Sequence, residues 1–151
     1  QLERPRWHIT ATDLSRRALC VARENARTLN ASTIEWIVSD WFASLAPRAV
    51  FDLILSNPPY LSDCDPHLPE LCAEPRQALV AGRDGLDAIR ALTALAPGYL
   101  CPNGLFLLEH GYTQGEAARA LFKQAGFMQV ATEYDLCGQE RVTGGYRSDF
   151  L

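Results

Sequence analysis

FDLILSNPPY, residues 51–60, joins a nearly all-apolar segment directly to an asparagine, two prolines and a tyrosine. A short apolar run of this kind is typical of a parallel β-strand that is covered on both faces. Proline has no backbone N–H and a fixed φ angle, so Pro58 and Pro59 end the strand and form a stiff turn. The stretch therefore predicts a central strand over residues 50–55, with Asn57 and Tyr60 at its carboxyl end.

Strand and helix patterns alternate on both sides of this strand. Further strands are predicted at 7–12, 33–38, 104–109, 127–134 and 141–147, and helices at 16–29, 85–95 and 113–124. Residues 58–82 are rich in proline and acidic residues and predict a long loop containing a short helix. This alternation predicts an α/β fold with a mostly parallel sheet. The last two strands have no helix between them, so we expect them to form an antiparallel edge.

Polar groups follow three of the predicted strands. They are Asp13, Asp40-Trp41 and Asn57-Pro58-Pro59-Tyr60. Ligands of open α/β sheets bind outside the carboxyl ends of the strands. If the strands are parallel, these three groups meet on one rim of the sheet.

Each of the first two groups allows two interpretations. Asp13 either accepts hydrogen bonds from the ribose hydroxyls of a nucleotide or serves as a turn or capping residue before the next helix. Asp40 and Trp41 either hold a base, with the carboxylate on an amino group and the ring on a face, or pack as ordinary turn residues.

The turn at 57–60 is more specific. Pro58 and Pro59 offer carbonyl oxygens but no N–H, and Asn57 adds a side-chain carbonyl, so the turn presents acceptors that suit an –NH2 group. Tyr60 can stack on a planar group. An amide nitrogen is a poor nucleophile because its lone pair is delocalised. Holding both of its hydrogens on acceptors would orient it for attack by positioning and electrostatics. The alternative is a rigid turn that only ends the strand.

At this point the chain resembles a known family. The motifs are SDWF at 39–42, FDLILSNPPYLSD at 51–63, DPHL at 65–68, EPRQALVAGRDGL at 74–86, GLFLLEHGY at 104–112 and ERVTGG at 140–145. Together they resemble the protein-(glutamine-N5) methyltransferases of peptide chain release factors, the PrmC/HemK family. The resemblance covers nearly the whole chain. It implies a Rossmann-like class I methyltransferase fold and S-adenosylmethionine as cofactor.

The resemblance also implies roles for the rim residues. Asp13 would bind the cofactor ribose, and Asp40 and Trp41 would line the adenine side. Asn57 would contact both cofactor and substrate amide. Pro58, Pro59 and Tyr60 would hold the glutamine of the release factor's Gly-Gly-Gln loop. Asn57, Pro58 and Tyr60 are thus the expected catalytic group.

The resemblance is incomplete at two places. The family's first strand and glycine-rich cofactor loop should precede Trp7, and six residues cannot hold them. We therefore expect residues 1–151 to be one methyltransferase catalytic domain that is incomplete at its amino-terminal side, with little cofactor affinity by itself. The sequence LPELCA between His67 and Glu74 also departs from the family loop, so its contribution to substrate binding is not implied.

Composition narrows the choice of function. The net charge is −4 and no basic block is present, which speaks against direct nucleic-acid binding and hence against the main competing activity, adenine-N6 methylation.

No apolar run approaches the roughly 18 residues that span a membrane. Five cysteines without C-x-x-C spacing indicate free thiols in a reducing compartment. We expect a cytoplasmic, monomeric protein. A truncated remnant that keeps only a binding surface is the non-enzymatic alternative.

Other polar groups have weaker signals. Glu109-His110 is expected to be a hydrogen-bonded structural pair rather than an acid/base pair. Cys64, His67 and Cys72 share one loop, but their spacing fits no standard zinc site and we expect no metal.

Two charged groups remain. Glu74 and Arg76 form either a salt bridge that supports the 57–60 turn or a solvated charge pair. Asp84-Gly85 is expected to cap the helix that follows.

Overall fold

The computed structural model describes residues 6–31, 33–46 and 50–148. Its contacts divide the chain into two compact units, residues 1–46 and 47–151. The expectation of a single catalytic domain over 1–151 stays a prediction, and each unit is described by itself.

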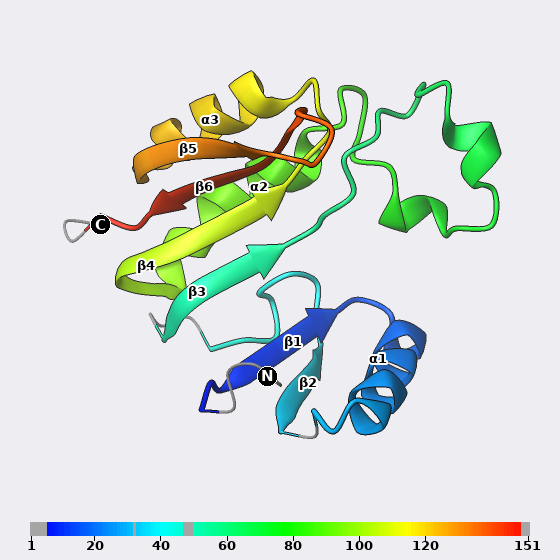
Figure 1. The fold of residues 1–151 in the computed structure, drawn as a ribbon, viewed down its shortest axis with the longest axis vertical. Coiled ribbons are helices and arrows are strands. Elements are labelled where there is room, and N and C mark those ends of the chain that lie inside the picture. Colours follow the sequence, from blue (N-terminus) through cyan, green and yellow to red (C-terminus); the bar gives the residue numbers. More distant parts are fainter. Residues whose placement is uncertain (1–5, 32, 47–49, 149–151) are drawn as a thin grey trace. The chain divides into compact units, whose positions relative to one another are not determined.

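The first unit is a β–α–β element. Strand β1 (Ile9–Asp13) pairs in parallel with β2 (Ile34–Val38), and helix α1 (Arg16–Thr28) connects them (Figure 1). Ser15 caps α1, because its side chain accepts a hydrogen bond from the amide of Ala18 at 3.2 Å. Leu19 and Ala26 of α1 are buried, so the helix packs its apolar side inward.

The second unit is a four-stranded sheet in the order β3-β4-β6-β5. The strands are β3 (Phe51–Ser56), β4 (Leu100–Glu109), β5 (Met128–Tyr134) and β6 (Glu140–Tyr146). β3 and β4 are parallel, whereas β6 runs antiparallel to both β4 and β5. The predicted antiparallel pairing of the last two strands is confirmed, with β6 inserted between β4 and β5.

Two helices lie together on one side of this sheet (Figure 1). They are α2 (Asp87–Leu95) and α3 (Gly115–Gln124). The rings of Phe106 in β4 and Phe122 in α3 stack with their centroids 5.1 Å apart, and Phe127 packs against both. Phe106, Phe122 and Ile89 are fully buried, so the core of this unit lies between the sheet and the two helices.

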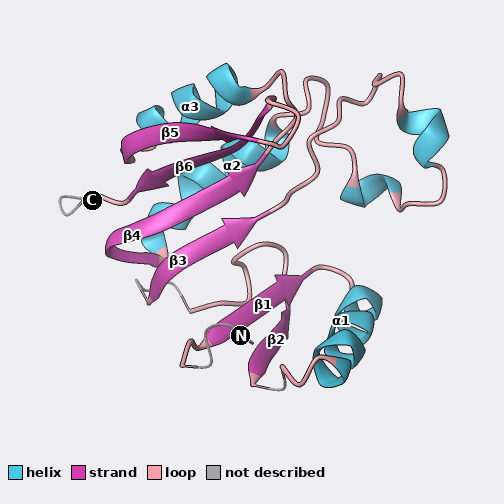
Figure 2. Cartoon of the chain, viewed as in Figure 1, coloured by secondary structure: helices cyan, strands magenta, loops and turns pink. Residues whose placement is uncertain are grey.

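A long segment between β3 and α2 is mostly loop (Figure 2). It contains two short 3-10 helices, η1 (Leu68–Leu71) and η2 (Arg76–Ala78), and a third, η3 (Ala96–Gly98), follows α2. The sequence predicted this loop with one short helix, and the structure has two.

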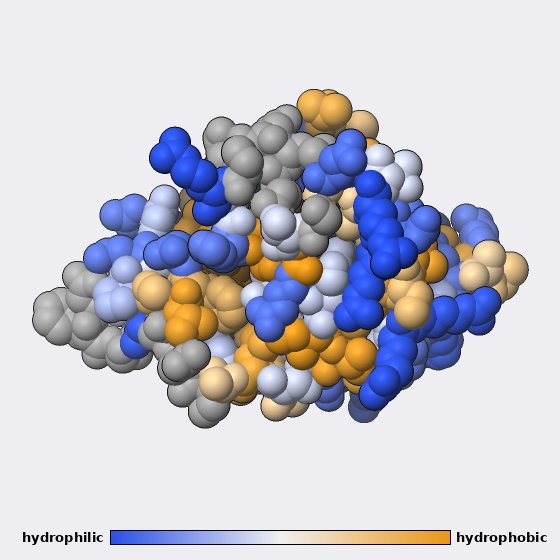
Figure 3. Space-filling model, turned by 90° about the horizontal axis from the view of Figure 1, so that it is seen from below, coloured by the Kyte–Doolittle hydropathy of each residue, from blue (hydrophilic) through white to orange (hydrophobic). Residues whose placement is uncertain are grey.

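Apolar side chains also reach the surface. Figure 3 shows one face of the molecule on which hydrophobic atoms lie beside strongly hydrophilic ones. Leu14, Val21 and Leu29 in the first unit and Leu55 in the second are each more than half exposed. No helix of the described residues is long and apolar enough to cross a lipid bilayer.

Candidate active site

The turn after β3 occupies the predicted position at the carboxyl end of a strand. Ser56 is the last paired residue, opposite Leu108 of β4. Asn57 follows and is exposed, Pro58 is buried, and Tyr60 is half-buried. The buried proline anchors the turn while the asparagine amide projects from it, which suits a group that must meet a ligand.

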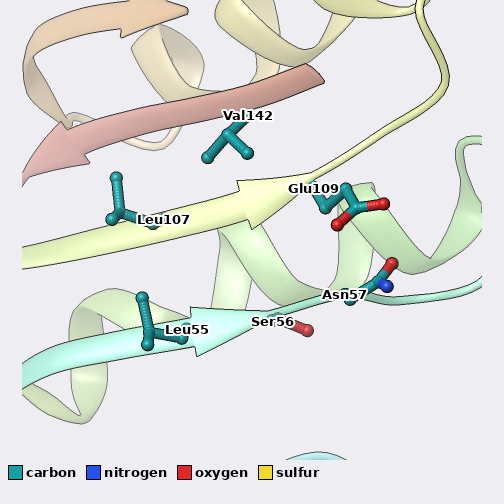
Figure 4. Close-up of a pocket in the computed structure, with 6 residues that line it drawn as sticks. All are labelled: Leu55, Ser56, Asn57, Leu107, Glu109 and Val142. Carbon is teal, nitrogen blue, oxygen red and sulfur yellow. The ribbon is translucent and has the colours of Figure 1, made fainter. Parts of the chain in front are cut away.

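A pocket of about 360 Å³ opens beside Asn57. Its walls are formed by Leu55, Ser56, Asn57, Leu107, Glu109 and Val142 (Figure 4). Asn57 and Glu109 lie side by side at the ends of β3 and β4, and Figure 4 shows their polar tips close to each other. A mostly apolar hollow with a few polar groups at one end is typical of a small-ligand site.

The pocket occupies one face of the sheet. Leu55 lies opposite Leu107, and Glu109 lies opposite Val142, in the strand register. Successive strand residues point to opposite faces, so these four side chains share one face, which we call the pocket face. Their neighbours Ile54, Phe106, Leu108 and Thr143 share the other, which we call the helix-covered face.

Glu109 and His110 are therefore not a pair. Glu109 lines the pocket, whereas His110 is fully buried on the helix-covered face. His110 Nδ1 lies 2.9 Å from the carbonyl oxygen of Gly111, and Nε2 lies 2.8 Å from the Thr143 hydroxyl. The expected Glu109–His110 hydrogen bond is wrong, because adjacent strand residues face opposite ways.

His110 belongs to a defined chain of hydrogen bonds. The Gly111 carbonyl can only accept, so Nδ1 carries the proton and Nε2 of the neutral ring accepts from Thr143. Thr143 accepts from Thr132 at 2.8 Å, and Thr132 accepts from Arg119 at 2.8 Å. Burial lowers the pKa of His110, which agrees with a neutral ring.

The backbone beyond the turn is paired with a second segment. The amide of Leu61 donates to the Leu79 carbonyl, and the amide of Ala81 donates to the Leu61 carbonyl, both at 2.9 Å. These bonds form a short parallel bridge between Leu61 and Val80. Residues 62–78 leave and return at this bridge, so it is the neck of the long loop.

Arg76 reinforces the neck by donating to the Asp63 carbonyl at 3.2 Å. The salt-bridge alternative for Glu74 and Arg76 is wrong, because Arg76 donates to a backbone carbonyl. No ion pair between Glu74 and Arg76 is found among the described residues.

Asp84 is placed differently from the prediction. The capping position of α2 is Leu86, and Asp84, two residues before it, accepts the Leu86 amide at 3.1 Å. Arg90 donates to both Asp84 oxygens and is the main reason that the pKa of this carboxyl falls to about 2. Asp84 therefore shapes the turn that enters α2 and does not cap the helix itself.

Asp13 and Asp40-Trp41 lie at neighbouring strand ends of the first unit. The Ser39 amide donates to the Asp13 carbonyl at 3.1 Å, which joins the carboxyl ends of β1 and β2. Asp13 and Asp40 are exposed, and one oxygen of Asp13 accepts the Ser15 amide at 2.7 Å. This contact fits the interpretation of Asp13 as a turn residue, since Ser15 is the helix cap, and it leaves the second oxygen of Asp13 for a ligand.

Trp41 has an unusual backbone. Its φ angle is +47°, in the left-handed region that bulky residues rarely adopt. Ser39 and Ser44 hold this turn, with the Ser44 amide on the Ser39 hydroxyl and the Ser44 hydroxyl on the Val38 carbonyl, both at 3.0 Å. Strain of this kind costs about 1–3 kcal/mol and clusters at ligand sites.

The structure thus brings together two of the three predicted groups in one unit and places the third in the other unit. Their meeting on a single rim stays a prediction. Among the described residues no cluster of three His, Cys, Asp or Glu side chains could hold a metal ion. In the 64–72 loop, His67 Nδ1 instead lies 3.0 Å from Asp65.

Gln114 is the site residue that sequence reasoning missed. Its side-chain amide donates to the carbonyl oxygen of Tyr60 at 2.9 Å. A glutamine 54 positions from Tyr60 has no spacing pattern that links it to the turn. Only the fold, which sets the start of α3 behind the end of β3, shows the contact.

Comparison with known proteins identifies the class first. A methyltransferase of Pyrococcus furiosus superposes with a TM-score of 0.68 at 17% identity, over 97% of this chain and 68% of the other. A ribosomal protein L11 methylase of Lactobacillus delbrueckii gives 0.62 at 20% identity, over 93% and 58%. The predicted class I methyltransferase fold, with its antiparallel edge, is confirmed.

The family follows from the sequence. A family model of the methyltransferase small domain matches residues 1–83, so the chain belongs to that family.

Curated relatives add a narrower similarity. The chain is 46% identical over 144 residues to a release factor glutamine methyltransferase of Bordetella pertussis and 47% identical over 145 residues to one of Xylella fastidiosa. These matches cover 94% and 95% of this chain but 53% and 52% of the relatives, so the chain spans about half of their length. The resemblance to release-factor methyltransferases is thereby confirmed.

Proposed function

We propose that this chain forms the site of an S-adenosylmethionine-dependent methyltransferase that modifies the side-chain amide nitrogen, N5, of a glutamine. The substrate is the Gly-Gly-Gln loop of peptide chain release factors. One observation carries the proposal: the Asn57–Tyr60 turn stands at the carboxyl end of β3, directly beside a pocket whose polar wall is Asn57 and Glu109. Similarity to proteins named release factor glutamine methyltransferases supports this choice of substrate.

The turn is suited to hold an amide. The exposed side chain of Asn57 offers a carbonyl acceptor, and the buried ring of Pro58 keeps the backbone carbonyl of that residue fixed. Two acceptors can take both hydrogens of a primary amide and so orient its nitrogen. Pro59 and Tyr60 do not line the pocket, and we assign them the substrate side chain from their place in the turn. The apolar floor of Leu55 and Leu107 suits its methylene groups.

Residues of the first unit fit the cofactor. The exposed carboxylates of Asp13 and Asp40 stand at the same end of β1 and β2 and can accept hydrogen bonds from ribose hydroxyls and the adenine amino group. The half-buried Trp41 ring offers an apolar face for the base. When bound, the cofactor supplies a methyl group on a positively charged sulfur.

The transfer is balanced without a metal or redox partner. The bound cofactor would supply the methyl group and keep the electron pair of its S–C bond, and the substrate nitrogen would supply the pair of the new N–C bond. One amide hydrogen would pass to water as a proton. The contribution of Asn57 and Pro58 is to hold the nitrogen in line with the methyl group. Because release factors act in translation, we place the activity in the cytoplasm.

The test measures transfer of labelled methyl from S-adenosylmethionine by the protein at its full natural length. Purified release factor and adenine-containing DNA are offered in parallel. We expect label on the release-factor glutamine, and a fall of about 100-fold or more in Asn57→Ala, because one positioned polar group at a reacting centre contributes that much. Asn25→Ala, on the exposed side of α1, is the matched control and should keep full activity.

Two other results would contradict the proposal. Label on DNA alone would assign the site to adenine, since the same acceptors suit an aromatic amino group. If the folded, unmodified protein labels neither substrate, the result would favour a remnant that has kept the turn without the reaction.

A further inference from the structure

Gln114 lies where three segments of the second unit meet. It occupies the position just before α3, and its side chain is half-buried. Its Oε1 accepts the amide of Gly111, at the end of β4, at 2.9 Å. Its Nε2 donates to the carbonyl of Tyr60 at 2.9 Å and to that of Gly85, before α2, at 3.2 Å.

These partners fix the orientation of the amide. The Gly111 amide can only donate, while the carbonyls of Tyr60 and Gly85 can only accept. Rotating the Gln114 amide by 180° would therefore break all three bonds. Both N–H groups and the oxygen are used, so the side chain is a fully satisfied three-way junction.

The space around the junction is filled. A Cβ atom added to Gly85, whose φ angle is +74°, would collide with the Tyr60 carbonyl and lie 2.8 Å from Gln114 Nε2. A Cβ atom on Gly111 would lie 3.1 Å from Gln114 Oε1. The two glycines therefore allow the three backbones to approach one amide closely.

The junction holds the turn from behind. Ser56 is fixed by its pairing with β4, and Leu61 is fixed by the bridge to Val80. Between these points the two prolines have no N–H with which to bind the rest of the fold. The Gln114 side chain holds the carbonyl of Tyr60, which is the last residue of the turn.

We infer that Gln114 is a positioning residue: its amide sets the place of the Asn57–Tyr60 turn relative to the ends of β4 and α2, and through the turn it sets the rate of methyl transfer. The rate part of this inference rests on the proposed function. Gln114 itself acts through Tyr60 and is not a catalytic residue.

The informative variant is Gln114→Glu. A carboxylate keeps the shape and the acceptor for Gly111 but cannot donate to the carbonyls of Tyr60 and Gly85. A negative charge at a helix amino terminus is favourable, so loss of α3 does not explain a defect. Gln124→Glu makes the same change at the exposed carboxyl end of α3, where the helix dipole makes a negative charge slightly unfavourable, and is a stringent control for the added charge. Gln114→Asn keeps the amide but shortens the side chain by one methylene, and provides a second variant if the first does not fold.

Two readouts are taken on the full-length protein. In steady-state methyl transfer to the release factor, we expect kcat to fall about 10- to 100-fold in Gln114→Glu, with the KM values within about threefold of the unmodified protein. In amide hydrogen exchange, we expect the Leu61 and Ala81 amides to exchange about tenfold faster, with the His110 amide of the β4–β6 ladder unchanged.

The outcomes separate this inference from the proposed function. A changed kcat with faster local exchange supports it, and an unchanged kcat in Gln114→Glu overturns it. If the unmodified protein transfers no methyl group to the release factor, the proposed function fails. The exchange readout then decides alone: faster exchange at Leu61 keeps Gln114 as the residue that positions the turn, and unchanged exchange overturns that role.

Discussion

The two faces of the β3–β4–β6 sheet are built from alternate residues of the same strands, yet they differ in almost every property. Phe106 and Leu108 of β4 are fully buried under α2 and α3, whereas Leu107 and Glu109 line an open pocket. Polar groups on the helix-covered face bond to one another, in the hydrogen-bond chain from Arg119 to His110. The pocket face presents Asn57 and Glu109 outward. Because one face supplies stability, the other can carry exposed polar groups that contribute little to it.

The sharpest test of this comparison is a pair of matched truncations in β4. Phe106→Ala should lower the free energy of unfolding by about 3–5 kcal/mol, because it empties a site packed against Phe122 and Phe127. Leu107→Ala, one residue away, should cost about 1 kcal/mol, since its side chain is only half-buried. Urea unfolding measures both. An equal loss of unfolding free energy in the two variants would mean that the pocket face contributes as much to stability as the helix-covered face.

A smaller effect is expected from the polar chain of the helix-covered face. Thr143→Val keeps the shape but removes the donor to His110 and the acceptor for Thr132. Leaving buried groups unpaired should cost about 1–3 kcal/mol. Thr113→Val, in the turn before α3, is a control with the same change of side chain. A cost no greater than that of the control would show that water or rearrangement replaces the lost bonds.

The smallest effect is a pH dependence from His110. Burial lowers its pKa in the folded state, so the unfolded chain takes up a proton first as the pH falls. The stability that depends on the neutral ring is complete above the ordinary histidine pKa of about 6.5 and decreases as the pH falls below it, by at most about 1.4 kcal/mol per unit.

The measurement compares unfolding free energies at pH 7.5 and 5.5 for the unmodified protein and His110→Gln. We expect the advantage of the unmodified protein to shrink at the lower pH. A constant advantage would mean that the ring is equally protonated in both states.

Much of this arrangement was predictable from the sequence because local patterns determine it. The apolar run and the proline pair located β3 and the turn at Asn57, and apolar periodicity over residues 16–29 located α1. The start of β4 was not predicted: Pro102, Asn103 and Gly104 indicate a turn, yet the strand begins at Leu100. The register explains this, because Leu100 pairs with Phe51 while Leu105 pairs with Leu53, so the intervening residues bulge out of the ladder.

The site was predictable in its parts but not in its connections. Chemistry of the residue types singled out Asn57, Pro58 and Tyr60, since two prolines behind an asparagine are rare at a strand end. The contacts of Gln114 with Tyr60 and Gly85 depend on how β4, α2 and α3 pack, and no local pattern records that packing. The error at Glu109 and His110 has a different cause: strand alternation, which is a local rule, outweighs adjacency in the chain.

The neck between Leu61 and Val80 has a consequence for how the protein can vary. Residues 62–78 leave and return at this bridge, so their length is uncoupled from the turn that precedes it. Doubling the length of such a loop adds only about 0.6 kcal/mol of closure cost. Changes of length in this segment therefore cost little, provided that Arg76 keeps its bond to the Asp63 carbonyl. The protein can change the surface that it offers to a partner there while Asn57 keeps its place.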